Sequence, residues 1–337
     1  MRDWLASELG WPRELRLEPA SADASFRRYF RVWRPSGATR VVMDAPPDKE
    51  DTGSYLHVGR LLRACGVHVP EVEAVDTARG FLLLEDLGNT HMLARLGTGG
   101  DPERLYGEAL ATLALIQLHG AAAVRELPPY GADALEREMR LLPTWFCARH
   151  LRLVLTAEDE ALLTDTFDFL VREALAQPVV FVHRDYHSRN LMITAQRSPG
   201  VIDFQDALAG PIGYDLVSLL KDCYISWPRA RVCAWLDDYR AQLRAAGADV
   251  GASNAEFMRW FELAGLQRHL KVLGIFARLW YRDGKSEYLV DLPLTLEYVR
   301  DTATRYDELR RFGAWVEAAL VPGLAAATAR ARAKMPA

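Results

Sequence analysis

Residues 179–206 read VVFVHRDYHSRNLMITAQRSPGVIDFQD, and this stretch decides the fold. Residues 179–182 are an uninterrupted run of β-branched and aromatic side chains after a proline, which predicts a strand buried on both faces. Apolar residues resume at 191–193 and again at 201–202, with a Pro-Gly turn between them. The stretch therefore predicts two apolar strands, 179–182 and 201–202, each of which delivers an acidic residue at its end.

The polar residues of this stretch fit the chemistry of phosphoryl transfer. That reaction needs a carboxylate for the incoming hydroxyl and oxygen ligands for the magnesium that accompanies nucleotide phosphates. Asp185 stands where the first would lie, and Asn190 and Asp203 stand where the metal ligands would lie. Asp and Asn are also common in loops because they turn the backbone. Their appearance together and in this order favours the catalytic interpretation. Zinc binding by His183 and His187 is disfavoured, because strand-like residues precede them and no third ligand is near.

Composition excludes several classes of protein. The chain has 337 residues, with 50% hydrophobic and 26% charged residues and a net charge of −4, so we expect a globular protein without a nucleic-acid partner. The N-terminus is charged where an export signal needs an apolar core, and we expect no run long enough to span a membrane. No protein partner is implied. Four scattered cysteines predict reduced thiols and a cytoplasmic location (Cys65, Cys147, Cys223, Cys233).

Hydrophobic periodicity divides the chain into two parts. A short helix at 2–10 precedes predicted strands at 15–17, 26–33, 40–44, 72–75 and 81–84, with one helix at 53–65. From residue 101 onwards the pattern is mainly helical, with helices at 102–119, 133–153, 157–176, 215–225, 229–246, 254–282, 293–312 and 314–320. We therefore expect an α+β protein, with a small antiparallel sheet in 1–88, a hinge near 85–89 and a larger helical part in 89–337. The loop at 21–25 consists of small residues and could bring backbone N–H groups close to phosphates.

Alternation along the strand at 26–33 predicts which way the side chain of Arg28 points. Arg28 shares a face with Phe30 and Val32, and this more apolar face is expected to lie inward. Arg28 would then point towards a bound phosphate. A surface arginine is an equally good interpretation.

The predicted helix at 254–282 carries two patterns. One face is apolar and should face the core (Leu266, Leu270, Leu273, Ala277, Trp280). Another face carries Arg268, Lys271, Arg278 and Arg282, and this positive charge suits an anionic or neutral substrate. A solvated charged face is the alternative. The tail from Pro322 is alanine-rich and basic, and we expect a frayed, solvated helix end.

The motifs resemble a known family. Residues 183–190 and 202–206 match the two signature motifs of the aminoglycoside-phosphotransferase-like family of the protein-kinase fold, and 213–216 match the segment that follows. Three further stretches look like the bacterial kinases that phosphorylate the anomeric hydroxyl of N-acetylmuramate and N-acetylglucosamine in cell-wall recycling (21–31, 42–47, 83–88). The resemblance covers nearly the whole chain. It is specific for fold and chemistry but not for substrate.

The resemblance implies a two-lobed, protein-kinase-like fold that uses ATP and Mg²⁺ on a small sugar. It makes Asp185 the catalytic base, and Asn190 and Asp203 the magnesium ligands. Nucleotide contacts are expected from Ser25, Phe26, Arg28, Met43, Leu84, Glu85 and Leu87. Substrate contacts are expected from His187, Gln205, Asp206, Arg268 and Arg282, with Lys285 as another candidate for the carboxylate of a muramyl sugar.

Two positions depart from the pattern of the protein kinases. The third strand normally supplies a lysine to the phosphates, whereas here the equivalent position is Met43, followed by Asp44. Gln205 stands where protein kinases have glycine, which predicts a metal loop that does not switch. Two alternatives stay open. Because the motifs do not specify the substrate, the chain could be a kinase of another small alcohol, such as an aminoglycoside, choline or homoserine. The missing lysine suggests a nucleotide-binding scaffold without catalysis.

Overall fold

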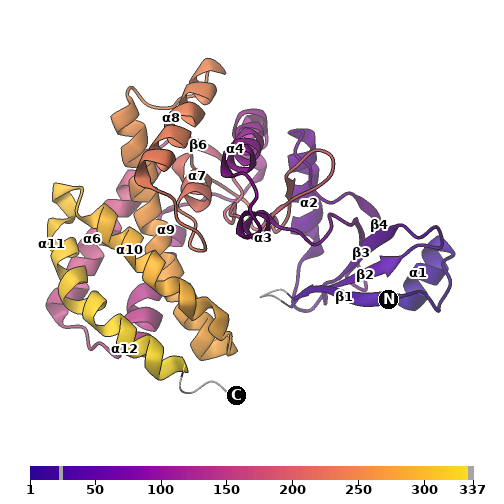
Figure 1. Ribbon diagram of the computed structural model, residues 1–337, viewed down its shortest axis with the longest axis horizontal. Helices are drawn as coiled ribbons and strands as arrows, with labels where there is room; N and C mark the ends of the chain where they lie inside the picture. Colours follow the sequence, from indigo (N-terminus) through magenta and orange to yellow (C-terminus); the bar gives the residue numbers. More distant parts are fainter. Residues whose placement is uncertain (23–25, 333–337) are drawn as a thin grey trace. The chain divides into compact units, whose positions relative to one another are not determined.

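The structure is a computed structural model that describes residues 1–22 and 26–332 (Figure 1). The chain divides into two compact units, and each is described by itself. The first unit consists of Met1–Gly120 and Arg189–Ala207, and the second of Ala121–Ser188 and the chain from Leu208 onwards. These units do not coincide with the predicted lobes 1–88 and 89–337. The division into a nucleotide-binding lobe and a substrate-binding lobe stays a prediction.

A five-stranded antiparallel sheet forms the first unit's framework, in the order β1-β2-β3-β5-β4. Its strands are β1 (Leu17–Ala22), β2 (Arg28–Trp33), β3 (Thr39–Asp44), β4 (Val72–Asp76) and β5 (Phe81–Glu85). Val32, Val42 and Leu83 lie on one face of this sheet and pack against Trp4 and Leu5 of helix α1 (Arg2–Leu9). The small antiparallel sheet predicted from the sequence is confirmed, although β1 extends into the stretch expected to be a loop.

The first unit also contains three further helices and a short hairpin. These are α2 (Thr52–Ala64), α3 (Met92–Gly97), α4 (Pro102–His119), β7 (Leu191–Met192) and β8 (Gly200–Val201). Asp51 begins α2 by accepting hydrogen bonds from the Gly53 and Ser54 N–H groups, at 2.8 and 3.1 Å. Asp101 caps α4 in the same way, with proline in the first turn. The starts of these two helices are thus determined by local sequence.

The second unit is mainly helical. Its elements are η1 (Gly120–Ala122), η2 (Val124–Glu126), α5 (Ala132–Met139), η3 (Leu142–Leu151), α6 (Ala157–Leu175), β6 (Val179–Val182), β9 (Leu208–Pro211), α7 (Gly213–Leu220), α8 (Arg229–Ala245), α9 (Asn254–Asp283), η4 (Ser286–Asp291), α10 (Leu292–Ala303), η5 (Asp307–Leu309), α11 (Arg310–Trp315), η6 (Val316–Leu320) and α12 (Val321–Arg332). Helix α9 has 30 residues, is capped by Ser253 and ends at Gly284 in the left-handed conformation. Four of its five predicted core residues are buried (Leu266, Leu270, Leu273, Ala277), and Trp280 is partly buried.

Two of the predicted long helices are interrupted in the structure. The helix expected at 133–153 consists of α5 and the wider turns of η3, with Pro143 near the start of η3. The helix expected at 293–312 ends at Ala303, before η5 and α11. Strand β9, which pairs with β6, was not predicted. Its sequence, Leu-Ala-Gly-Pro, has almost no strand preference of its own.

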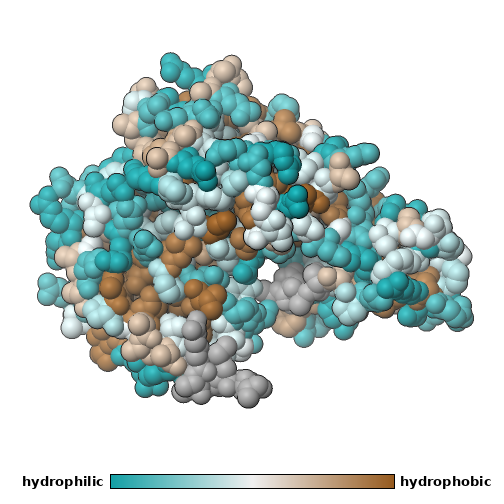
Figure 2. Space-filling view, in the orientation of Figure 1, coloured by the Kyte–Doolittle hydropathy of each residue, from teal (hydrophilic) through white to brown (hydrophobic). Residues whose placement is uncertain are grey.

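The expectation of a frayed, solvated tail from Pro322 is wrong for the described residues. Leu324, Ala327 and Ala331 of α12 are buried and belong to the main core of the second unit. Figure 2 shows apolar side chains gathered beside this helix. Among the described residues, Asp307–Ala331 is also the one helical stretch long and apolar enough to cross a membrane, so the expectation that no run has this length is wrong. Because this stretch contributes several residues to a protein core, it is a weak indication of a membrane span.

Candidate active site

The loop that follows β6 in the second unit is held by a buried carboxylate. Asp215, in the first turn of α7, accepts hydrogen bonds from the His183 N–H at 2.6 Å and the Arg184 N–H at 2.9 Å. Arg184 has a φ of 83°, a conformation that is costly for a residue with a side chain. Burial raises the pKa of Asp215 to about 7, although both N–H groups and Arg268 oppose the shift. Asp215 therefore braces the loop in a backbone shape that the loop would not hold alone.

A second carboxylate holds the other end of this loop. Asp222 accepts hydrogen bonds from the Ser188 N–H at 3.0 Å and from the Ser188 hydroxyl at 2.5 Å. Between the two anchors the His187 N–H donates to the Asp185 carbonyl at 3.1 Å. Asp185 thus lies in a short loop that is fixed at both ends, as a positioned catalytic group requires. Asp222 was not predicted, because its partner is far away in sequence.

The Asp185 carboxylate is surrounded by positive charge. Its side chain is 38% exposed, and its Oδ1 lies 3.7 Å from a guanidinium nitrogen of the buried Arg268. Burial alone would raise the pKa of Asp185, but Lys271, Arg268, His187 and Arg184 outweigh it and hold the pKa well below its usual range. Asp185 is therefore ionised at neutral pH and can accept a hydrogen bond from a hydroxyl.

A buried carboxylate on α5 balances part of this charge. Glu138 accepts hydrogen bonds from Arg184 at 2.5 Å and from the Tyr130 hydroxyl, and it pairs with Lys271 at 3.0 Å. Burial favours its neutral form, but Lys271 and Arg184 lower the pKa of Glu138 below its ordinary value. Sequence reasoning missed Glu138, because nothing in the pattern of α5 distinguishes it from a surface glutamate.

Two of the four cations on the positive face predicted for α9 are not solvated. Arg268 donates to the Arg184 carbonyl at 2.9 Å and to the Tyr214 hydroxyl at 3.3 Å, and Lys271 donates to the same hydroxyl at 3.1 Å. Both cations are buried. Through these bonds Arg268 and Lys271 support the predicted catalytic loop, residues 183–190, so the alternative of a solvated charged face is wrong for these two residues.

The predicted metal loop, residues 203–206, belongs to the first unit. Asp203 has a φ of 63°, and its carboxylate lies 3.3 Å from the Asn190 amide and 2.9 Å from the Gln205 amide nitrogen. Phe204 points the other way and packs against the ring of Tyr55, with 4.7 Å between ring centroids. The buried aromatic ring thus fixes the loop, and three predicted residues come together beside it.

The residues of the metal loop fit a magnesium ion. Mg²⁺ prefers oxygen donors and is usually held by one or two protein carboxylates together with substrate phosphates. Asp203 and Asn190 supply a carboxylate and an amide, and the neighbouring Gln205 Oε1 is buried without a hydrogen-bond partner in the described residues. Within the described ranges there is no group of three or more His, Cys, Asp or Glu residues that could hold a metal alone. The site therefore resembles a magnesium site completed by a nucleotide rather than a protein-only metal centre.

Arg27, rather than Arg28, lies beside the metal loop. The Arg27 guanidinium is 3.8 Å from the Asp203 carboxylate and 3.6 Å from that of Glu50. Arg28 is 65% exposed at its side chain and pairs with Asp44 at 2.5 Å. The predicted direction of Arg28 is wrong, because the apolar face that it was assigned to is the one that α1 covers. The amphipathic pattern of residues 2–10 could have indicated that a helix covers this face of the sheet and keeps Arg28 away from the nucleotide.

Several of the predicted nucleotide contacts lie in the first unit, and their role stays a prediction. Met43 lies opposite Leu82 in the sheet, so it shares a face with Leu84, and both Met43 and Leu84 are buried. The Glu85 side chain lies 3.1 Å from a His68 ring nitrogen. Leu87 packs so closely on Gly200 that a Cβ there would lie 2.7 Å from its side chain.

The loop before β2 carries the two remaining nucleotide candidates. Phe26 is exposed, and its N–H donates to Glu50 at 2.9 Å. Ser25 lies outside the described residues.

The predicted substrate contacts are spread over both units. His187 meets the ring of Tyr224 edge-on, with 5.4 Å between centroids, and Tyr224 leads to Phe276 in the second unit. Arg282 is exposed and binds Asp283 at 2.7 Å. In the first unit, Asp206 is exposed and receives a hydrogen bond from Gln205 at 3.4 Å. Their roles as substrate contacts, and that of the buried Arg268, stay predictions.

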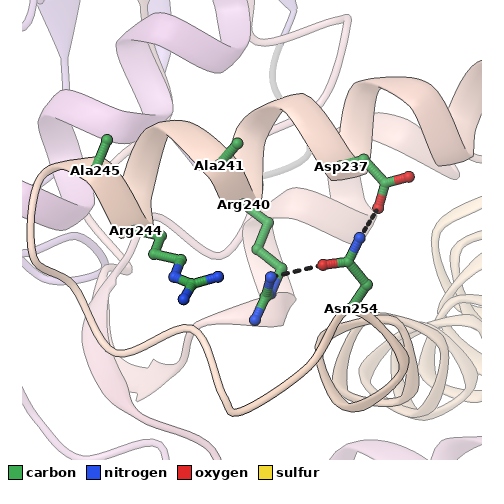
Figure 3. Close-up of a pocket in the computed structure, with 6 residues that line it drawn as sticks. All are labelled: Asp237, Arg240, Ala241, Arg244, Ala245 and Asn254. Carbon is green, nitrogen blue, oxygen red and sulfur yellow. Dashed lines mark hydrogen bonds between the residues drawn. The ribbon is translucent and has the colours of Figure 1, made fainter.

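A pocket of about 530 Å³ lies on α8, and none of the predicted site residues lines it (Figure 3). Arg240 lines it but is satisfied by Asn254 at 2.6 Å and by the carbonyls of Val250 and Gly251. Arg244, which also lines it, is exposed. Arg240 is therefore a structural residue that holds the loop after α8.

Comparisons with known proteins agree with the motifs. The model of the family described as "Phosphotransferase enzyme family" matches residues 16–260. A protein of Pseudomonas aeruginosa named N-acetylmuramate/N-acetylglucosamine kinase is 47% identical over 308 residues, covering 90% of this chain and 89% of the relative. A protein of the same name from Neisseria meningitidis serogroup B is 47% identical over 313 residues, covering 92% of each chain.

Solved structures confirm the fold. The ethanolamine kinase of Plasmodium vivax superposes with a TM-score of 0.63 at 13% identity, covering 91% of this chain and 86% of that one. The ADP-bound aminoglycoside phosphotransferase APH(2'')-Ib superposes with a TM-score of 0.56 at 16% identity, covering 88% and 96%. The predicted protein-kinase-like fold and the resemblance stated from the motifs are thus both confirmed. By its sequence match over most of its length, the chain belongs to the phosphotransferase enzyme family.

Proposed function

We propose that this chain transfers the γ-phosphoryl group of ATP to the anomeric hydroxyl of N-acetylmuramate and N-acetylglucosamine, giving sugar 1-phosphates for cell-wall recycling. The observation that carries this proposal is the 47% identity to kinases of that name over nine-tenths of the chain. The ionised, anchored Asp185 supports it, because a hydroxyl acceptor needs such a group.

In this mechanism Asp185 accepts a hydrogen bond from the anomeric hydroxyl and directs its oxygen at the γ-phosphorus. A new P–O bond forms to the sugar, the bond to the β-phosphate oxygen breaks, ADP leaves, and the hydroxyl proton passes to Asp185. Its low pKa makes Asp185 a weak base, so we expect orientation to be its main contribution until late in the transfer. This agrees with the loose transition states of phosphoryl transfer, in which the nucleophile has formed little bonding.

We propose that Asn190 and Asp203 hold Mg²⁺, which when bound would neutralise charge on the nucleotide phosphates. Arg27 would supply the positive charge that the third strand lacks, since it is nearly buried and lies beside Asp203. The buried face of Met43 and Leu84, with the backbone of Glu85 and Leu87, would hold the adenine. Because ATP is a cytoplasmic metabolite, we place the reaction in the cytoplasm.

The test is magnesium-dependent ADP release from the purified chain with N-acetylmuramate, N-acetylglucosamine, kanamycin, choline and homoserine. We expect turnover on the two N-acetyl sugars and none when the anomeric hydroxyl of N-acetylglucosamine is blocked as a methyl glycoside. Asp185→Asn should lower kcat by about 10²–10⁴-fold, the usual contribution of a positioned base. Thermal stabilisation by ATP should remain, which shows that the variant is folded.

Three other results of this assay would contradict parts of the proposal. Turnover only on kanamycin, choline or homoserine would keep the mechanism and refute the substrate. Turnover of the methyl glycoside would refute the anomeric position. ATP binding without turnover on any compound would favour the scaffold alternative.

A further inference from the structure

Helix α9 carries four cations along one face. Successive residues of an α-helix advance by about 100°, so Arg268, Lys271, Arg278 and Arg282 fall within an arc of about 80°. Arg268 lies at the catalytic loop, 3.7 Å from Asp185. Because helical side chains tilt towards the N-terminal end of their helix, the later arginines lean back towards that loop.

Three of these cations already have partners within the second unit. Their acceptors are the Arg184 carbonyl for Arg268 at 2.9 Å, the Glu138 carboxylate for Lys271 at 3.0 Å and the Asp283 carboxylate for Arg282 at 2.7 Å. Arg268 and Lys271 are also buried. These three positive charges are consequently committed to the protein itself.

Arg278 differs from the other three. Within residues 1–22 and 26–332, no hydrogen-bond acceptor or carboxylate pairs with it, and its Nε is buried without a partner. The side chain is half-buried, and burial together with the nearby Arg282 lowers the pKa of Arg278, while Asp283 opposes the shift. A half-buried guanidinium without an anion is costly, so the site favours a bound anion.

We infer that Arg278 forms a subsite for the carboxylate of the lactyl group, which N-acetylmuramate carries and N-acetylglucosamine lacks. This inference rests on the proposed function. A guanidinium matches a carboxylate through two parallel hydrogen bonds, which gives both affinity and orientation. The contact is available to only one of the two sugars, so Arg278 would set the preference between them without taking part in the transfer.

The experiment compares kcat and KM of both sugars for the wild type, Arg278→Gln and Arg278→Lys. For Arg278→Gln we expect kcat/KM with N-acetylmuramate to fall by about 10- to 100-fold, mainly through KM, as the loss of a charge-assisted pair predicts. The value for N-acetylglucosamine should stay within about twofold, because that sugar loses no charge-assisted contact. For Arg278→Lys we expect kcat/KM with N-acetylmuramate to lie between those of the wild type and Arg278→Gln. Lysine keeps the positive charge but cannot form the two parallel hydrogen bonds of a guanidinium.

A matched control separates this contact from long-range attraction. Arg244 on α8 is exposed and, in the part of the chain that the structure describes, is also without an ion-pair partner (Figure 3). Arg244→Gln removes one positive charge and should leave both sugars unchanged. An equal loss for both sugars in Arg278→Gln, or no loss for either, would overturn the subsite. If the wild type phosphorylates neither sugar, the proposed function fails instead, and the two failures are distinguishable.

Discussion

Replacing Glu138 by glutamine tests the buried charge network most directly. Glu138 is 7% exposed. Its carboxylate accepts hydrogen bonds from Arg184 and the Tyr130 hydroxyl and forms an ion pair with Lys271. The variant keeps the shape of the side chain but leaves two cations without their anion. Removing one partner from a buried ion pair costs about 3–5 kcal/mol, and we expect the lower end because Arg184 is still partly exposed. For a folding unit of this size, about 3 kcal/mol corresponds to a fall in Tm of about 6–12 °C.

The measurement is thermal unfolding by circular dichroism, together with kcat/KM, which should fall because Arg184 belongs to the catalytic loop. The control is Glu136→Gln, which removes a half-exposed carboxylate of the same helix that pairs with Arg140 at 3.0 Å and should change stability by less than about 0.5 kcal/mol. Adding Lys271→Met to Glu138→Gln restores the charge balance, so the double variant should be more stable than the single one by about 1 kcal/mol or more. A Glu138→Gln protein with wild-type Tm, or a double variant whose losses simply add, would refute the reasoning.

Three further perturbations follow from the geometry. Asp203→Asn should raise the Mg²⁺ concentration for half-maximal activity by at least about tenfold, as even outer-shell ligand losses do, and an unchanged magnesium titration would contradict the proposed role. Burial lowers the pKa of His150 to about 4. Between pH 6.5 and 4 this histidine is therefore protonated in the unfolded chain but neutral in the folded chain. The free energy of unfolding should consequently fall as the pH drops from 6.5 to 4. His150→Phe should reduce this slope by about 1.4 kcal/mol per pH unit, measured by urea unfolding, and an unaltered slope would exclude His150 as its source. Gly80→Ala should lower Tm and leave KM for ATP unchanged, because Gly80 has a φ of 73° and a Cβ there would lie 1.8 Å from the Ala45 carbonyl oxygen; retention of the wild-type Tm would show that the turn can relax.

The parts of the site that sequence predicts well are those encoded within a few residues. Asp185, Asn190 and Asp203 stand out because they occur in a fixed order beside short apolar strands, and their catalytic and metal-binding roles stay predictions. The strands of the first unit were recovered for the same reason, since alternation of apolar and polar residues is a local signal.

The parts that sequence does not predict depend on tertiary partners. Arg27 and Arg28 are neighbours with the same chemistry, and only the packing of α1 on one face of the sheet decides which one lies beside Asp203. Arg268 and Lys271 of α9 look like part of a solvated face in the sequence, and only the structure shows Tyr214 and Glu138 packed against them. A periodic pattern gives the face of a helix but not what that face meets.

The discontinuity of the first unit has a consequence for the order in which the protein folds during synthesis. Domains generally form as their residues leave the ribosome. Here the sheet strands β1–β5 emerge early, but Phe204, which packs on Tyr55, arrives only after residues 121–188 have been made. The Val201 N–H, which donates to the His68 carbonyl at 2.7 Å, is equally late. The ring of Tyr55 on α2 therefore lacks this contact until the metal loop, residues 203–206, has been made, and a chain stalled before residue 207 should be a substrate for chaperones or proteases.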